Sequence, residues 1–133
     1  MKLVVNVDGG ARGNPGPAAI GVVVSDADGT VIGEYAERIG NASNNVAEYR
    51  AVIAGVRRAR DLGATELELI NDSELVARQL MGAYKVKHEA MKPLYAEAKA
   101  ALEGLRKWQI HNVPRAQNAR ADALVNEALD GLR

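Results

Sequence analysis

The first 39 residues contain three strand-like patterns in succession, and this arrangement restricts the possible folds more than any other feature of the chain. Apolar residues alternate with others in the first pattern, and β-branched residues are frequent in the other two; the patterns cover residues 3–8, 19–25 and 30–39. Residues 9–17, GGARGNPGP, are rich in Gly and Pro and are expected to form a turn or loop. Asp28-Gly29 is a hairpin signal. The chain is therefore expected to open with three antiparallel strands.

Helix-type and strand-type patterns alternate in the rest of the chain. The predicted helices are residues 46–62, 73–81, about 88–106 and about 118–130, and the predicted strands are residues 66–71 and 107–113. Residues suited to helix ends flank three of these helices. The first can be capped by Ser43, Asn44 or Asn45 and stopped by Gly63, the second can be capped by Asp72 or Ser73 and stopped by Gly82, and the last can be capped by Asn118. The order β-β-β-α-β-α-α-β-α predicts an α/β fold with a mixed five-stranded sheet, three antiparallel strands and then βα units, with helices packed on it.

Length and composition exclude several classes of protein. The 133 residues suit one core, so a single domain over residues 1–133 is expected, and with 4% aromatics and no Phe its core must consist of Val, Leu, Ile and Ala. The absence of cysteine excludes disulfides and thiolate sites and fits the cytoplasm. No apolar run near the N-terminus is long enough for a signal sequence or a membrane span. The formal net charge of zero is a mild argument against a nucleic-acid partner.

Four acidic residues occupy positions where strands end or helices begin. Asp8 ends the first strand and Asp72 follows the fourth, while Glu48 and Asp122 are expected in the first turns of the first and last helices. Sites in open α/β sheets collect at the carboxyl ends of strands, so the four side chains are expected to meet at one sheet edge.

Each acid alone has an ordinary structural explanation. Asp is common in turns and at helix starts, and acids in a first helical turn are favoured by the helix dipole. A cluster of four carboxylates, in contrast, is costly unless cations fill it. Oxygen ligands suit Mg²⁺ or Mn²⁺, and two such ions suit phosphodiester hydrolysis.

Together with the short motifs around them, these residues resemble type-1 ribonuclease H. The motifs are Asp8-Gly9-Gly10, Gly13-Asn14-Pro15-Gly16, Asn44-Asn45 followed by Glu48, Asp72-Ser73, and Val113-Pro114-Arg115 followed by Asn118, Ala121 and Asp122. The resemblance covers essentially the whole chain and is to the compact bacterial and archaeal form. It implies a ribonuclease-H-like fold and a monomeric endonuclease that cuts the RNA strand of RNA–DNA hybrids. It also implies two metal ions with substrate bound, and 5′-phosphate and 3′-hydroxyl ends.

The resemblance also implies roles for particular residues. Asp8, Glu48, Asp72 and Asp122 match the catalytic metal ligands. The matched substrate-binding positions are Gly9, Gly10, Asn14, Ser43, Asn44, Asn45 and Arg115, with Ser43 placed to hold a DNA phosphate. Asn44 and Asn45 remain equally explicable as helix caps, and Asn14 as a turn residue. Short amides can donate to and accept from ribose 2′-hydroxyls, which a hybrid displays on one strand only.

Two departures from the family pattern affect the expected activity. Only residues 82–87, GAYKVK, occupy the place of a basic insertion found in longer members, so weaker and salt-sensitive substrate binding is expected. Arg115 stands where many members have a histidine. An arginine cannot act as a base but can bind a phosphate. Neither His88 nor His111 is assigned a catalytic role. Two alternatives remain: a catalytically inactive hybrid-binding module, or a related nuclease that also accepts double-stranded RNA or RNA–DNA junctions.

Overall fold

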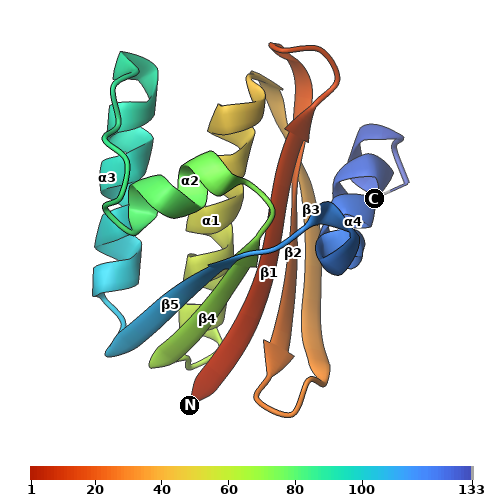
Figure 1. Ribbon diagram of the computed structural model, residues 1–133. Coiled ribbons are helices and arrows are strands. Elements are labelled where there is room, and N and C mark those ends of the chain that lie inside the picture. Colours follow the sequence, from red (N-terminus) through yellow and green to blue (C-terminus); the bar gives the residue numbers. More distant parts are fainter. Residues whose placement is uncertain (133) are drawn as a thin grey trace.

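The five strands form one mixed sheet in the order β3-β2-β1-β4-β5 in the computed structural model, which describes residues 1–132 (Figure 1). The strands are β1 (Lys2–Ala11), β2 (Gly16–Asp26), β3 (Val31–Ala42), β4 (Glu66–Asn71) and β5 (Lys107–Asn112). The helices are α1 (Asn44–Asp61), α2 (Glu74–Leu80), α3 (Lys92–Glu103) and α4 (Ala119–Leu129). The predicted element order and mixed sheet are confirmed; the last residue of the expected 1–133 domain lies outside the described residues.

The parallel pairing of β1 and β4 brings Asp8, which lies inside β1, beside Asp72, which follows the end of β4. The expectation that Asp8 ends the first strand is wrong, because β1 continues to Ala11. The β1–β2 and β2–β3 pairs are antiparallel, as predicted, whereas β1–β4 and β4–β5 are parallel. Asn6 pairs with Ile70, so the continuation of each strand by two residues reaches Asp8 and Asp72. Parallel neighbours end on the same side of a sheet, which places these two acids next to each other.

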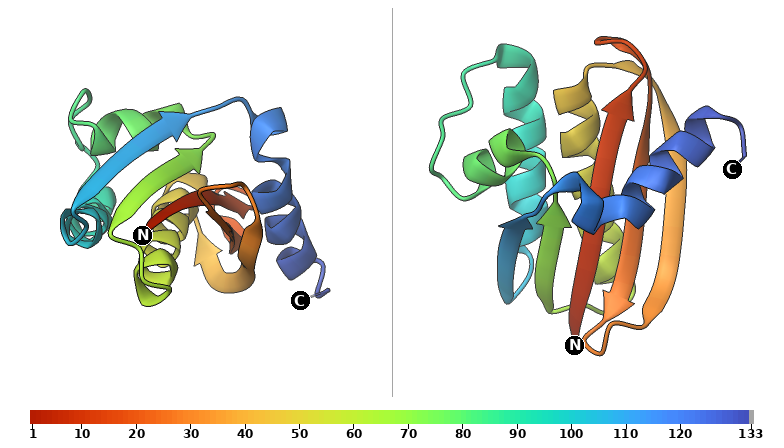
Figure 2. Two further views of the ribbon diagram at one scale, coloured as in Figure 1. Left: turned by 90° about the horizontal axis from the view of Figure 1, so that it is seen from below. Right: turned by 45° about the vertical axis from the view of Figure 1, so that its right-hand side comes forward.

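The helices cover both faces of the sheet. Figure 2 shows α1, α2 and α3 on one face and α4 alone on the other. The alternation of side chains in β2 reflects this: Ile20 and Val22 join the large core beneath α1, while Ala19 and Val23 pack against α4. The buried hydrophobic side chains are mainly Val, Leu, Ile and Ala, as the composition predicted.

Several predicted element boundaries are wrong. The expected loop at residues 9–17 is mostly strand, because the ladder continues to the pair Ala11–Ala18 and Arg12 N donates to Pro17 O at 2.8 Å. The expected helix at about residues 88–106 is a short 3₁₀ turn, Glu89–Met91, followed by α3. Pro93 lies in the first turn of α3, where its missing N–H costs no hydrogen bond.

The predicted capping and stop residues of α1 and α2 are confirmed, whereas the predicted cap of the last helix is wrong. The hydroxyls of Ser43 and Ser73 accept from the amides of residues three positions later, and Gly63 and Gly82 have positive φ just after α1 and α2. Asn118 makes no capping hydrogen bond, and a 3₁₀ turn, Arg115–Asn118, precedes α4.

None of the helices within residues 1–132 combines the length and the apolar character needed to cross a bilayer.

Candidate active site

A glycine on β1 allows α1 to approach the sheet at backbone distance. A Cβ atom on Gly9 would lie 2.2 Å from the carbonyl oxygen of Ala47, so no larger residue fits without moving the helix. The next residue of α1 is Glu48, and its Oε1 accepts a 2.7 Å hydrogen bond from Gly9 N. Contact between backbones therefore places the Glu48 carboxylate beside Asp8. The expectation that Glu48 lies in the first helical turn is wrong, because α1 begins at Asn44 and Glu48 falls in its second turn.

A second glycine has the same effect on the opposite face. Gly21 of β2 pairs with Asp8 in the antiparallel register. A Cβ atom on Gly21 would lie 2.3 Å from the carbonyl oxygen of Ala121, so α4 also rests directly on backbone. Asp122 follows Ala121 in the first turn of α4, as predicted. Asp8 is thus approached by one acid-bearing helix on each face of the sheet.

Three of the four acids form a group that could hold a metal ion. Asp8, Glu48 and Asp72 each offer a carboxylate oxygen, and these oxygens all lie within 4.8 Å of one another. Asp122 lines the same hollow, of about 470 Å³, and its carboxyl interacts with that of Asp8. We call this space the acid hollow: it is lined by Asp8, Glu48, Asp72 and Asp122 together with Gly9, Gly10, Ala11, Arg12, Asn44, Asn45, Ser73, Arg115, Val125, Asn126 and Leu129.

Burial and mutual repulsion make the ionised forms of two of these acids, Asp8 and Glu48, unfavourable. Burial is the largest cause that raises the pKa of Asp8, followed by its hydrogen bond to Glu48 and by repulsion from Glu48 and Asp72. The pKa of Glu48 rises to about 7, again mainly through burial, although its contacts with Asp8, Gly9 N–H and Arg115 oppose the rise. The group therefore retains protons near neutral pH unless cations supply positive charge.

A buried oxygen of Asp72 is a suitable ligand for such a cation. Asp72 Oδ2 is buried and has no hydrogen-bond partner among the described residues. The nearest cationic group, Arg115 Nε, is 3.8 Å away, which is too far for a hydrogen bond. A buried carboxylate oxygen without a donor is costly in a protein, whereas hard divalent cations prefer such ligands. The donor set fits a Mg²⁺- or Mn²⁺-type ion.

The expected substrate-binding residues lie at or near the acid hollow, but several side chains already have partners in the protein. Gly9, Gly10, Asn44, Asn45 and Arg115 line the hollow; Asn14 and Ser43 do not line it. The Asn14 side chain accepts from Asn44 N at 3.1 Å, and the Asn44 side chain accepts from Ala11 N at 2.9 Å. Ser43 caps α1. These bonds fasten the β1–β2 hairpin to the start of α1.

The structure adds residues that the sequence interpretation did not single out. Arg12 lines the acid hollow, and its Nη1 lies 2.7 Å from Asp130 Oδ1 beyond the end of α4. Gly21 is the second addition, and a glycine inside an otherwise β-branched strand is a recognisable signal of close backbone approach. The sequence holds no comparable signal for Arg12, because its position depends on a tertiary contact with Asp130, which is distant in the chain. His111 lies 3.4 Å from Glu68 and does not line the acid hollow.

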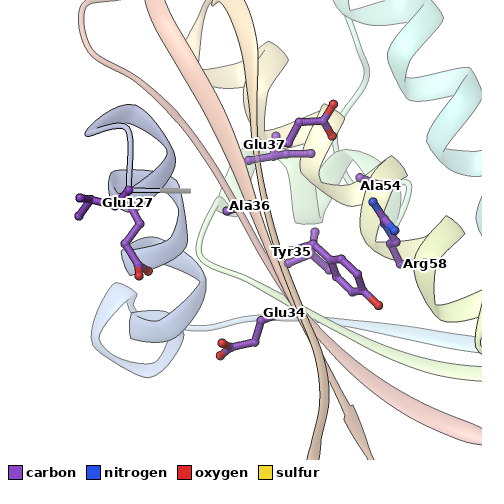
Figure 3. A pocket seen from close by; sticks show the side chains of 10 residues that line it. Glu34, Tyr35, Ala36, Glu37, Ala54, Arg58 and Glu127 are labelled. Carbon is purple, nitrogen blue, oxygen red and sulfur yellow. The ribbon is translucent and has the colours of Figure 1, made fainter.

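A larger hollow, of about 710 Å³, lies around the edge strand β3 and contains none of the predicted site residues. Figure 3 shows Glu34 and Glu127 on the α4 side of this strand and Tyr35 and Arg58 on the α1 side. The Arg58 guanidinium stacks 4.2 Å from the Tyr35 ring centre. No cluster of candidate metal ligands is found there within the described part of the chain.

Solved structures with closely similar folds are ribonucleases H1. The enzyme from the archaeon Halobacterium salinarum has a TM-score of 0.96 and 45% identity, with 98% of this chain and 99% of that chain covered. LC11-RNase H1, isolated from compost and solved in complex with an RNA/DNA hybrid, has a TM-score of 0.92 and 41% identity, with 98% of each chain covered.

Curated relatives are longer than this chain. The Mycobacterium tuberculosis bifunctional protein Rv2228c is 50% identical over 131 residues, which is 98% of this chain and 36% of that protein. Ribonuclease HI of H. salinarum is 48% identical over 123 residues, which is 92% of this chain and 62% of that protein. The chain thus spans about a third to three-fifths of the length of these relatives.

The chain is an α/β protein of the ribonuclease-H-like class, as defined by its sheet order, its two glycine-mediated helix contacts, and the acids on β1 and just after β4. A family model described as reverse transcriptase-like matches residues 6–128. The chain is 45% identical to the H. salinarum enzyme over nearly the full length of both structures. It therefore belongs to the ribonuclease H1 family.

Proposed function

We propose that this chain is a metal-dependent endonuclease that hydrolyses the RNA strand of RNA–DNA hybrids and leaves 5′-phosphate and 3′-hydroxyl ends. The observation that carries the proposal is the convergence of four carboxylates in the acid hollow, one of them with a buried oxygen that has no hydrogen-bond partner within residues 1–132. Membership of the ribonuclease H1 family supports the same chemistry, and the hybrid bound to LC11-RNase H1 supports the substrate class.

Asp8, Glu48, Asp72 and Asp122 would hold two Mg²⁺ ions when substrate is bound, with Mn²⁺ as a possible substitute. Such ions supply Lewis-acid charge for phosphodiester hydrolysis. The protein contributes a fixed ligand geometry: Gly9 N–H orients Glu48, and Asp72 is fixed by the end of β4. Asp8 lies at the centre, because both helices approach the sheet beside it.

Substrate recognition would come from the rim of the acid hollow. Asn45 is exposed at the start of α1, and Asn44 keeps its NH₂ group as a donor because its carbonyl oxygen already accepts from Ala11 N. Both amides can reach ribose hydroxyls of a hybrid in its wide minor groove. Asn14 and Ser43 fix these residues and would add contacts to the strands, while Gly9 and Gly10 permit close approach of the backbone.

Arg115 would bind a phosphate near the acids rather than move a proton. Its side chain is 79% exposed, and it retains its charge at every accessible pH. We further propose that residues 1–133 form one catalytic domain that acts as a monomer. The absence of cysteine suits the reducing cytoplasm as its location.

The test uses an end-labelled RNA–DNA hybrid, with RNA–RNA and DNA–DNA duplexes and an RNA–DNA junction in parallel, in Mg²⁺, in Mn²⁺ and in chelator. The proposal predicts internal cuts in the RNA of the hybrid, lost in chelator. Cutting of the other RNA substrates would widen the specificity. Binding of the hybrid without any cutting in either metal would instead identify an inactive binding module.

A further inference from the structure

Asn118 joins the start of α4 to β1, the strand that carries Asp8. Its side chain is 2% exposed and makes no helix cap. Its Nδ2 donates to the carbonyl oxygen of Val7 at 2.8 Å, and its Oδ1 accepts from Asn6 Nδ2 at 3.1 Å. Val7 is the residue immediately before Asp8, so this amide fixes the entry of α4 one residue away from the acid.

Gly21 determines how closely the same end of α4 approaches the sheet. It lies opposite Asp8 in the sheet, and the carbonyl of Ala121 rests where its Cβ would be. Asn118 therefore sets the position of α4 along β1, and Gly21 sets its depth on the sheet. Asp122, four residues after Asn118 and one after Ala121, is carried by this doubly fixed first turn.

Separate hydrogen bonds hold the far end of α4. Arg38 Nε donates to Ala128 O at 2.7 Å, and Arg38 Nη2 donates to Leu129 O at 3.4 Å. In the first turn, Arg120 also donates to the Glu34 carboxylate at 2.7 and 3.0 Å, but this pair is exposed and therefore weaker. Loss of the contacts at one end of α4 should thus displace that end more than the other.

We propose that Asn118 and Gly21 are positioning residues that set the reach of Asp122 toward Asp8. This inference rests on the proposed metal-dependent nuclease for its effect on activity, but not for its effect on structure. Asn118 is buried and does not line the acid hollow. It acts through the Val7 carbonyl and the first turn of α4. A shift of that turn by about 1 Å would be enough to lower catalysis by about 100-fold.

The test compares Asn118→Ala and Asn118→Asp with Arg38→Ala as the matched control at the far end of the same helix. Asn118→Asp keeps an acceptor for Asn6 but replaces the donor to Val7 with an oxygen and, when ionised, adds a buried negative charge, so Asn118→Ala is the variant that removes the contact without adding charge. The readouts are a crystal structure of each variant, Mn²⁺ and Mg²⁺ binding by calorimetry, and kcat and KM on the hybrid. We expect Asp122 displaced from Asp8 in both Asn118 variants, metal affinity and kcat each lowered by about 10- to 100-fold, and KM unchanged.

Arg38→Ala should lower thermal stability and leave the Asp8–Asp122 geometry, metal affinity and kcat of the folded protein as they are. Gly21→Ala should act like Asn118→Ala; if it fails to fold, the Asn118 variants still decide. An unmoved Asp122 in Asn118→Ala, or equal losses of kcat in Asn118→Ala and Arg38→Ala, would overturn the proposal. If the unsubstituted protein does not cut the hybrid, the proposed function fails, and the crystal structures alone then decide the positioning role.

Discussion

The amide of Gly9 donates a 2.7 Å hydrogen bond to Oε1 of Glu48, and the same glycine leaves room for the backbone of α1. One residue thus both admits the helix and orients its acid. On the other face, Gly21 admits α4 and Asp122 in the same way. The candidate site therefore depends as much on two missing side chains as on four carboxylates.

Gly9→Ala should lower both stability and activity. The added methyl group would lie 2.2 Å from Ala47 O, so α1 must move away from β1. Overpacking of this kind costs about 1–3 kcal/mol, measurable by chemical denaturation. Gly10→Ala is the matched control for stability, because its methyl group would meet only Val125 Cγ1 at 3.6 Å, an ordinary contact. Equal stability of the two variants would contradict the packing role assigned to Gly9.

Asp8→Asn and Asp72→Asn should abolish cleavage and preserve the fold. Each change removes a negative charge from the proposed ligand set with little change in shape, so metal binding is lost while packing survives. In metal-free buffer both variants should melt at or above the temperature of the unsubstituted protein, since a repelling carboxyl is gone. Circular dichroism and the hybrid assay measure the two effects. Glu103→Gln, at an exposed position of α3, controls for the loss of charge alone. Unimpaired cutting by either Asp variant would remove that residue from the site.

Stability of the metal-free protein should fall as pH rises from about 5 to 8. Burial raises the pKa of Asp8 and Glu48 in the folded state, that of Glu48 to about 7, whereas both titrate near pH 4 when unfolded. Between these values the folded state binds more protons than the unfolded state, so the free energy of unfolding decreases with rising pH. The contribution is complete below about pH 4 and is lost as pH passes the folded values.

Melting curves in chelator at several pH values test this dependence. Asp8→Asn should flatten it, and saturating Mg²⁺ should raise the melting temperature most at the alkaline end, where the carboxylates are ionised. A melting temperature in chelator that rises steadily from pH 5 to 8, with no response to Asp8→Asn, would contradict the raised pKa values.

Most of the fold could be predicted because its signals are local. Alternation in residues 3–8 and helical spacing after residue 45 each identify an element without its neighbours. The missed boundaries depend on tertiary pairing: residues 9–11 look like a turn, yet they continue β1 because β2 and α1 pack against them. The predicted cap at Asn118 is wrong for the same reason: its position before a helix predicts a cap, whereas the Val7 carbonyl that it binds is 111 positions away.

The four acids could be selected from the sequence because the end of a parallel strand and the starts of helices can be located to within a few residues, although Asp8 lies inside β1 and Glu48 in the second turn of α1. The cost of clustering the acids could also be predicted. Their burial could not, because it depends on the two glycine contacts, and burial is the largest cause of the raised pKa of Asp8 and Glu48. Roles of Asn14 and Asn44 also needed coordinates: both amides are joined to the backbone between the hairpin and α1. Their proposed contacts with nucleic acid remain a prediction.

Arg115→Ala should reduce hybrid binding and leave most of the turnover. The Arg115 side chain is 79% exposed, and its Nε is 3.8 Å from Asp72 Oδ2, too far for a hydrogen bond that orients the acid. Loss of one exposed phosphate contact should raise KM by less than about 10-fold and reduce the salt dependence of binding by about one counterion. Steady-state kinetics at several salt concentrations measure both, with Arg115→Lys retaining the charge. A loss of kcat as large as that of Asp72→Asn, not restored by Lys, would instead place Arg115 among the catalytic groups.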